Sequence, residues 1–499
     1  MAALKVIAQS SPDPDTDPDA YLHPDLHPDD IAIHLPSGAQ LEPGAGEVIL
    51  AAMAEHPEAA AVYWDILVGD QRQARPAWSP TRVQSEPGVC LPLGIRASWP
   101  HFNSSSHPLE MERRLAESDA VVLHIPSVLT RHADPAGAAQ GQGAASSSEE
   151  LRLSMRSSPA QGEGADHPGF EPGPRPGTHR RRPLSRGQAS TSIIIPSAGR
   201  SLPGSTVPVL VRCLETLALL DPPPLEVVVV IGDEYQGEPP TKADGLPVRV
   251  VYRGTGSFDF SRAINCGLLA SRGEFVLLLN DDIEAETEAE TTDWLGRMVA
   301  HLQDPTVGVV GAALLYPDRT VQHIGMVIDD AHPLHPFQHH KLADTAAYGG
   351  DVARDTISVT GACLLARRSD LLAVGGTSKE FPTSYGDIDL CLRLRRSGFR
   401  VVVEPAAVLI HHESASREPI IEPWEWGSFL YRWGEVLDPW YHPAYRRPDD
   451  PDHKNRNADH LGPVDPDASW PARRAEIRST MHESQMHEYR LGIPPRIHP

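Results

Sequence analysis

The sequence predicts an α/β protein whose main domain is a mostly parallel sheet with helices on both faces, preceded by a partial α/β domain. Two observations carry this prediction. From about residue 191, β-branched apolar runs alternate with helical segments, which is the pattern of strands joined by crossover helices. One run, F-V-L-L-L, continues directly into N-D-D (Asn280 to Asp282). Such a strand delivers carboxylates to the carboxyl edge of a sheet, where open α/β folds bind ligands.

The elements of the main domain follow in order along the chain. T-S-I-I-I-P (Thr191 to Pro196) is expected to be a buried strand closed by proline, and Val207 to Leu220 has helical periodicity. The later elements are a helix from Ser261 to Ser271 and strands at Leu225 to Ile231, Val248 to Tyr252, Glu274 to Leu279, Val307 to Leu315, Ile357 to Ala366 and Phe399 to Val403. A helix opens at G-D-I-D (Gly386 to Asp389), and A-A-V-L-I leads as a strand into His411.

Amino-acid composition and apolar pattern divide the 499 residues into four parts. Residues 1–132 contain globular segments, and residues 191–445 form the main domain. Residues 133–190 become Ala/Gln/Gly/Ser-rich, then Pro/Gly-rich, then basic (His179 to Arg182). This composition predicts a disordered linker whose Arg run is solvated rather than a contact for anionic lipid. Residues 446–499 are expected to be a polar tail.

Composition excludes several classes of protein. The net charge of −23 argues against a broad nucleic-acid surface. Five scattered cysteines without a C-x-x-C pair make a disulfide framework or zinc site improbable and fit a reducing cytoplasm. No signal peptide opens the chain, and no apolar run approaches the roughly 18 residues of a membrane span. We therefore expect a cytoplasmic protein, with peripheral contact at the inner face of a membrane left open.

A set of motifs in a fixed order resembles glycosyltransferase family 2, over about half of the chain. The motifs are S-I-I-I-P, N-D-D, L-L-Y-P-D-R-T-V-Q-H-I-G (Leu314 to Gly325), T-G-A-C-L-L (Thr360 to Leu365), Y-G-D-I-D-L-C-L-R (Tyr385 to Arg393) and H-H-E-S-A-S-R (His411 to Arg417). The resemblance implies the GT-A fold of nucleotide-diphosphosugar transferases. By this pattern the chain is similar to bacterial cell-surface polysaccharide transferases, including rhamnosyltransferase-like members.

The resemblance also implies a metal site. Asp282 is similar to the family's ligand for Mg²⁺ or Mn²⁺, and His411 to its metal-binding histidine. Hard cations prefer oxygen ligands, and a cation that bridges a diphosphate assists its departure. Asp281 would face the ribose or the donor sugar. His412 should point to the opposite face of the strand from His411.

The carboxylate pair in G-D-I-D supplies the expected base. Asp387 resembles the family residue that deprotonates the acceptor hydroxyl for inverting attack at the anomeric carbon, a role in which position matters more than resting pKa. Asp389 is expected to cap or buttress the helix that follows. Asp389 as the base remains the alternative.

The nucleotide should lie after the first strands. Pro196 and Arg200 are expected beside the nucleobase, while Arg262 either faces the diphosphate or base or is a surface residue. Family members usually end the second strand with an acidic residue that reads the base, but Ile231 stands there in this chain. Asp233 could substitute after a small shift. The aromatic segment from Pro423 should mostly pack over the core.

The N-terminal part has a weak sequence similarity to the main domain. I-A-I-H-L-P-S-G aligns with V-L-L-L-N-D-D-I, and V-V-L-H-I-P-S-V-L-T-R-H (Val121 to His132) aligns with the strand that ends at His411. This pattern predicts a degenerate, partial transferase-like domain without the carboxylates, unless the similarity is coincidental.

The expected function is metal-dependent, inverting transfer of a hexose-type sugar from a UDP- or dTDP-sugar to a glycan or lipid-linked glycan acceptor, in cell-surface polysaccharide biosynthesis at the cell envelope. The alternative is a transferase-like binding or scaffold protein that has lost turnover. A nucleotidyltransferase is disfavoured because P-S-A-G-R lacks a glycine-rich, basic phosphate loop.

Overall fold

The computed structural model describes most of both folded parts of the chain. The described residues are 3–8, 26–35, 39–68, 71–73, 78–103, 108–132, 169–184, 189–221, 223–240, 245–285, 293–329, 331–412, 422–436, 438 and 440. The tail predicted at residues 446–499 and the predicted linker up to residue 168 lie outside this set.

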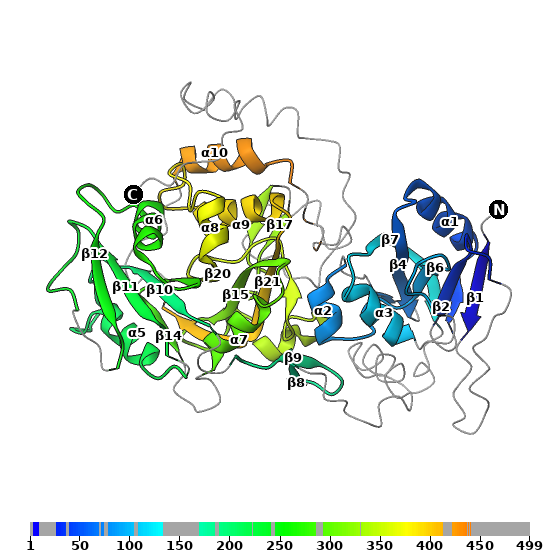
Figure 1. Cartoon of the computed structure of the whole chain (residues 1–499), viewed down its shortest axis with the longest axis horizontal. Coiled ribbons are helices and arrows are strands. Elements are labelled where there is room, and N and C mark those ends of the chain that lie inside the picture. Colours follow the sequence, from blue (N-terminus) through cyan, green and yellow to red (C-terminus); the bar gives the residue numbers. More distant parts are fainter. Residues whose placement is uncertain are drawn as a thin grey trace.

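The main domain is built on a ten-stranded sheet with the strand order β12-β11-β10-β13-β20-β15-β21-β14 (Figure 1). Its strands are β10 (Thr191–Pro196), β11 (Glu226–Ile231), β12 (Val248–Tyr252), β13 (Phe275–Leu279), β14 (Ile283–Ala285), β15 (Val307–Leu315), β16 (Val321–His323), β19 (Arg354–Asp355), β20 (Cys363–Arg367) and β21 (Arg400–His411). The first four strands of that order are parallel, as predicted. Beyond them the sheet is mixed, because β20 runs antiparallel to both neighbours.

Helices cover both faces of this sheet. They are α5 (Val209–Leu217), α6 (Phe260–Ala270), α7 (Trp294–His301), α8 (Arg368–Ala373), α9 (Gly386–Arg396) and α10 (Pro423–Trp433), with a 3₁₀ helix at Leu342–Tyr348. One core packs α5 and α7 against the sheet, and another packs α6, α8 and α9 against the opposite face. Helix α10 carries Trp426 and Phe429, which stack with Tyr385 ahead of α9. The aromatic segment therefore packs over the core, while Trp424 is exposed.

Two strands differ from the sequence prediction for local reasons. Strand β20 begins at Cys363 and not at Ile357, because the N–H groups of Thr360 and Gly361 bond to side chains and not to a neighbouring strand. Strand β21 continues through Pro405 to His411, where two strands were expected. Its register shifts after Glu404, as expected where proline cannot donate to the ladder.

A second, seven-stranded sheet forms the N-terminal domain, with the order β1-β2-β6-β4-β7-β3 and β5 on β4. Its elements are β1 (Leu4–Ala8), β2 (Ile31–Leu35), β3 (Ala39–Leu41), β4 (Ala59–Val68), β5 (Gln71–Gln73), β6 (Leu93–Arg96), β7 (Val121–His132), α1 (Ala45–Glu55), α2 (Pro80–Ser85) and α3 (Pro108–Ala116). Figure 1 shows this domain beside the main domain, with α2 nearest to it.

The N-terminal sheet repeats the back part of the main sheet strand for strand. The order β1-β2-β6-β4-β7-β3 corresponds to β10-β13-β20-β15-β21-β14. At each step the two sheets have the same parallel or antiparallel pairing. The first register shift falls after Ala59 in β4 and after Val307 in β15. Counterparts of β11 and β12 are missing from the described part of this domain, so it corresponds to six of the eight strands in the main order.

The predicted linker is wrong in its last part. Residues 169–184 include a hairpin of β8 (Phe170–Pro172) and β9 (His179–Arg181) that packs on the main domain. Arg297 on α7 bonds to Glu171 at 2.9 Å, and the backbone N–H of Leu184 bonds to the carbonyl of Gly296. The hairpin could not be predicted from local composition, because its stability comes from these partners more than a hundred residues away in the sequence. Its Arg run is consequently part of the fold, with Arg180 paired to Glu171.

A buried polar interface joins the two domains. Asp355 on β19 accepts from the Ser79 hydroxyl at 2.6 Å and from Arg400 at 2.7 Å. Arg175 bonds to Glu86 at 3.2 Å and to Asp351 at 2.6 Å. Helix α2 therefore docks on the edge of the main sheet through hydrogen bonds at Ser79 and an ion pair at Glu86. No helix in the described ranges is long and apolar enough to cross a membrane.

Candidate functional site

A cavity of about 480 Å³ lies at the carboxyl ends of β10 and β13. Its lining comes from Pro196, Ala198, Arg200, Glu234, Phe258, Phe260, Asn280, Asp281, Asp282, Thr360, Gly361, Ala362, Phe381, Thr383, Ser384, Tyr385, Gly386, Asp387 and His411. Because the two strands are parallel, their ends meet at one edge of the sheet. Six of the residues predicted from the sequence thus share one cavity: Pro196, Arg200, Asp281, Asp282, Asp387 and His411.

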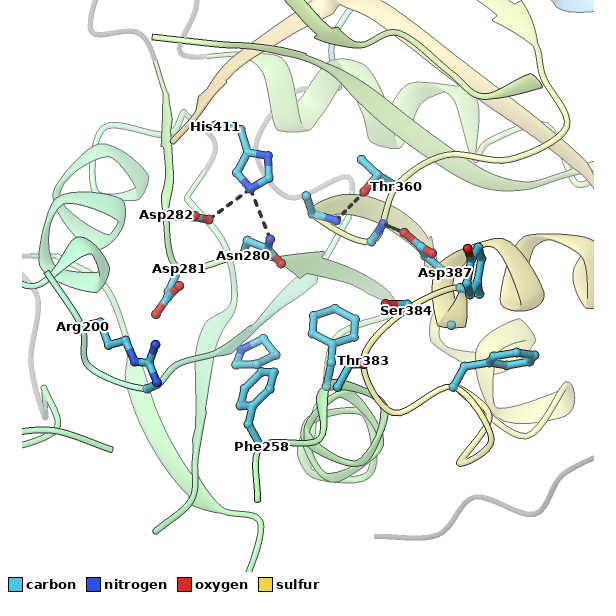
Figure 2. Close-up of a pocket in the computed structure, with 18 of the residues that line it drawn as sticks. Arg200, Phe258, Asn280, Asp281, Asp282, Thr360, Thr383, Ser384, Asp387 and His411 are labelled. Atoms are coloured by element: carbon cyan, nitrogen blue, oxygen red, sulfur yellow. Dashed lines mark hydrogen bonds and ion pairs between the residues drawn. The ribbon is translucent and has the colours of Figure 1, made fainter. Parts of the chain in front are cut away.

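The cavity has two chemically different ends. Figure 2 shows Arg200, Asp281 and Asp282 toward one end and Thr383, Ser384 and Asp387 toward the other, with His411 above Asp282. Asp281 and Asp282 are 5% and 4% exposed, so neither is a solvated surface acid. The sequence prediction of two separate acidic clusters facing one space therefore matches this arrangement.

At the first end, His411 and Asp282 face one another. The Nε2 atom of His411 lies 3.2 Å from Oδ1 of Asp282 and 3.3 Å from Nδ2 of Asn280. The Nδ1 atom of His411 lies 2.5 Å from Oε1 of Gln322. Since an amide oxygen only accepts, Nδ1 carries the proton and Nε2 of the neutral ring presents a lone pair.

This pair fits a divalent cation. Oδ1 of Asp282 is buried and has no hydrogen-bond donor, so in the neutral ring two lone pairs oppose each other. A cation between them would relieve the repulsion, and Gln322 would hold the histidine ring in the ligating orientation. Within the described residues, however, no three His, Cys, Asp or Glu side chains form a metal cluster. Mg²⁺ commonly uses one or two carboxylates together with substrate phosphates, so the fit requires oxygens from a ligand.

Asp281 is held next to this corner by Ser197. The Ser197 hydroxyl donates to its Oδ2 at 2.6 Å. Burial raises the pKa of Asp281 to about 7, and the charge of Asp282 acts in the same direction. Asp281 can therefore donate or accept a hydrogen bond near neutral pH. His412 faces away and lies 3.1 Å from Glu284.

At the second end, Asp387 is fixed by two backbone groups. Gly361 N–H donates to its Oδ2 at 2.7 Å, and Ile388 N–H donates to its Oδ1 at 2.9 Å. A Cβ atom on Gly361 would lie 3.2 Å from Cβ of Asp387, so glycine permits the close approach. The carboxylate lines the cavity with its orientation set, and no basic side chain bonds to it in the hydrogen bonds described here.

Asp389 lies outside the cavity lining and is fully buried. It accepts from Arg393 at 2.8 Å, from Arg432 at 2.6 Å and from Trp433 at 3.0 Å. Burial opposes its charge, but Arg393 and Arg432 outweigh that effect and lower the pKa of Asp389. The residue therefore ties α9 to α10. It buttresses the helix as expected but does not cap it, since the N-terminal cap position is Tyr385.

The nucleotide corner differs from the prediction in two residues. Asp233 is exposed, accepts from the Tyr252 hydroxyl and does not line the cavity. Arg262 also lies outside the lining, with its guanidinium on the carbonyl of Thr255 at 3.2 Å. The next acidic residue, Glu234, lines the cavity instead.

Glu234 is held by a buried arginine. Arg253, whose side chain is 1% exposed, donates to Oε2 of Glu234 at 2.6 Å. The other oxygen, Oε1, is buried without a partner. Sequence reasoning missed Glu234 because it chose between two adjacent acids without knowing which faced inward. The only sequence signal was the acidic pair after the second strand.

Comparison with known proteins agrees with the motifs. Residues 192–349 match the model for Glycosyl transferase family 2. The O-antigen biosynthesis protein RfbC of Myxococcus xanthus is 32% identical over 429 residues, which cover 80% of this chain and 32% of that protein. The chain thus spans about a third of that relative's length. An N-acetylglucosaminyl-diphospho-decaprenol L-rhamnosyltransferase of Mycobacterium tuberculosis is 26% identical over 42% of this chain and 75% of its own.

Among solved structures, a mannosyltransferase from Pyrobaculum calidifontis in complex with GDP-Man and Mn²⁺ aligns with a TM-score of 0.34 and 18% identity. The alignment covers 52% of this chain and 66% of that chain. The family match and the strand order support the fold, since β12, β11, β10 and β13 form the parallel half of the sheet. The predicted GT-A fold is confirmed for the main domain.

Proposed function

We propose that this chain, which contains a family 2 glycosyltransferase domain, transfers a sugar from a nucleotide-diphosphate sugar to a hydroxyl of a glycan acceptor. The observation that carries the proposal is the single cavity with Asp282 and His411 at one end and Asp387 at the other. The first end suits the diphosphate and the second suits the attacking hydroxyl. The names of the Myxococcus and mycobacterial relatives favour cell-surface polysaccharide biosynthesis as the setting.

Asp282 and His411 would hold Mg²⁺ or Mn²⁺, which supplies Lewis-acid assistance to the departing nucleoside diphosphate. Gln322 accepts from Nδ1 of His411 and so directs Nε2 toward Asp282. Arg200 lines the same end and adds positive charge beside the nucleotide. This division of labour predicts that a chelator abolishes turnover.

Asp387 would act as the general base. The acceptor hydroxyl oxygen forms a bond to the anomeric carbon while the bond from that carbon to the diphosphate oxygen breaks. The hydroxyl proton passes to Asp387, and the diphosphate leaves with the electron pair of the broken bond. One displacement of this kind inverts the anomeric configuration. Asp389 is a poor candidate for this step because three donors already occupy its buried carboxylate.

The nucleobase would lie against Pro196 and Arg200, with Glu234 in the acidic role expected of Asp233. The unpartnered Oε1 of Glu234 can accept one N–H from the base, which suits the ring N–H of uracil or thymine in a UDP- or dTDP-sugar. Asp281 would bond to the ribose or the donor sugar. The loop at Thr383 and Ser384, held by buried Glu425, would face the acceptor.

The N-terminal domain would take no part in the chemistry. In the sequence, Pro36, Ser37 and Gly38 stand where the main domain has its carboxylates. We assign it a supporting role through its interface with β19. An entirely inactive scaffold protein is less well supported, since the carboxylates and the histidine of the main cavity are all present. With a lipid-linked acceptor, as the mycobacterial relative's name describes for that protein, the reaction would take place in the cytoplasm at the inner face of the membrane.

A donor screen tests the proposal. Purified protein is incubated with UDP-, dTDP- and GDP-sugars with Mn²⁺, with Mg²⁺ or with EDTA, and nucleotide release is measured. We expect metal-dependent release from a UDP- or dTDP-sugar, and its loss in Asp387→Asn once acceptor is supplied. Full activity in EDTA would remove the metal assignment. Absence of both release and nucleotide binding with every donor would reject the proposed function.

A further inference from the structure

Strand β16 connects the two ends of the cavity through adjacent residues. Gln322 bonds to His411 at the metal end. His323, the next residue, is 1% exposed and bonds toward the other end. Both belong to the motif V-Q-H-I-G, in which only Gln322 has a role in the proposed mechanism.

His323 accepts two backbone hydrogen bonds at one nitrogen. The N–H groups of Gly325 and Thr360 point to its Nε2 at 3.3 Å and 3.4 Å. Gly325 has a φ of 92°, a conformation that favours glycine, and this turn brings its N–H back to the ring. Because Nε2 is an acceptor, the proton of the neutral ring must lie on Nδ1.

His335 completes the arrangement. Its Nδ1 lies 2.9 Å from Nδ1 of His323. Since His323 donates from Nδ1, His335 must accept there and carry its own proton on Nε2. Burial lowers the pKa of both rings, that of His335 to about 4, which agrees with two neutral tautomers.

The loop that presents His335 is tied to β16 and carries backbone strain. Phe337 and His339 have positive φ values of 64° and 65°, which are costly for such side chains. The N–H of His339 bonds to the carbonyl of Val321, and the N–H of Val321 bonds to the carbonyl of His340. Strain held by surrounding contacts is typical of functional sites.

Two consecutive N–H groups link this histidine pair to the base. Thr360 N–H binds His323, and Gly361 N–H binds Oδ2 of Asp387 at 2.7 Å. We propose that the His323–His335 pair is a positioning device for the general base: it holds the Thr360–Gly361 turn so that Gly361 N–H orients the carboxylate of Asp387. This inference rests on the proposed function for the role of Asp387, but the hydrogen bonds that it invokes can be tested separately.

The first test does not depend on activity. Amide hydrogen exchange of peptides that contain Thr360 and Gly361 is compared in the wild-type protein, in His323→Leu and in the control His301→Gln. His301 on α7 is an equally buried histidine that lies outside the cavity lining. Its Nε2 lies 2.7 Å from Glu404. We expect faster exchange at Thr360 and Gly361 in His323→Leu only. Unchanged exchange in a folded His323→Leu protein would overturn the proposal even if transfer is never observed.

The second test is kinetic and uses the active donor from the screen. Substitution of groups that orient a ligand or a reacting residue typically lowers activity about 10- to 100-fold. We expect a fall of this size in kcat for His323→Leu and His335→Gln, with little change in KM for the donor. His323→Gln retains an acceptor near the Nε2 position and should lose less. It also serves if His323→Leu fails to fold.

Two further readouts separate positioning from general damage. Loss of the Gly361 hydrogen bond removes a donor that favours the charged carboxylate of Asp387, so the fall of kcat on the acidic limb of its pH profile should begin at a higher pH. The effect of His323→Leu should also disappear in an Asp387→Asn background, because both changes remove the same function. An unchanged acidic limb, or additive losses in the double variant, would overturn the proposal.

Discussion

The two carboxylates of G-D-I-D should respond to the same substitution in opposite ways. Asp387→Asn should remove most of the transfer rate while leaving the fold intact. Asp389→Asn should leave a normal rate per folded molecule but lower the free energy of unfolding. The sequence separates them by two residues, while the structure places one in the cavity and the other between two helices.

The magnitude for Asp389 follows from its partners. The carboxylate accepts from two arginines and a tryptophan with no exposure to solvent. An amide in its place has only one acceptor oxygen, so an NH₂ group faces at least one donor. Arg393 loses its counter-charge, and Arg432 keeps only its pair with Glu380. Breaking such a buried pair typically costs about 3–5 kcal/mol. This exceeds the roughly 1 kcal/mol of a lost helix cap and is a large share of a total stability of about 5–15 kcal/mol.

Thermal unfolding and single-turnover transfer can be measured on the same samples. For a domain of this size we expect a fall in Tm of roughly 6–20 °C for Asp389→Asn. For Asp387→Asn we expect a loss of about 10²- to 10⁴-fold in kcat, with nucleotide affinity nearly unchanged. A stable, inactive Asp389→Asn protein beside a fully active Asp387→Asn protein would refute the assignment and exchange the two roles.

Three other predictions concern the rest of the site. Gln322→Leu should weaken Mn²⁺ activation by about 10- to 100-fold, measured as the metal concentration for half-maximal release; unchanged activation would show that His411 needs no support. Glu234→Gln should raise KM for a UDP- or dTDP-sugar, whereas the neighbouring control Asp233→Asn should not, and equal effects would contradict the inward placement of Glu234. Because Arg393 and Arg432 lower the pKa of Asp389 below 3.8, its contribution to stability is present above that pH and is lost as pH falls through the lowered value. The Tm of wild type should therefore fall more steeply below about pH 4 than that of Asp389→Asn.

Residue pattern was sufficient for the strands that begin the main domain and for the residues that follow them. Buried parallel strands read as continuous apolar runs, so Thr191–Pro196 and Phe275–Leu279 were visible, as were the carboxylates after the second. Glu234 was missed because two adjacent acids give the same pattern whichever one turns inward. The contact between Asp389 and Arg432 could not be predicted either, since Arg432 lies 43 residues later and reaches Asp389 only because α10 packs there.

The β8–β9 hairpin illustrates a second limit of sequence patterns. Its residues are rich in glycine, proline and arginine, a composition typical of linkers. Its order depends on Arg297 and on the carbonyl of Gly296, neither of which local composition can indicate. The positions of His323 and His335 required the same kind of information, because a loop and a short strand bring them together.

The two sheets share their strand pairing, so the N-terminal sheet shows how this topology folds when the acids after β13 are absent. The N-terminal sheet keeps the strand pairing and the first bulge of the main sheet, while its sequence has Pro36, Ser37 and Gly38 where the main domain has its acids. Pro108 opens the helix that corresponds to α9. A sheet of this topology therefore folds without acids at the positions of Asp281 and Asp282, whereas α3 retains a buried acid, Glu112, that accepts from the N–H of Cys90. In the proposed mechanism Asp281 and Asp282 serve the reaction while their burial opposes their charge, so neutral substitutions at either position are expected to make the protein harder to unfold.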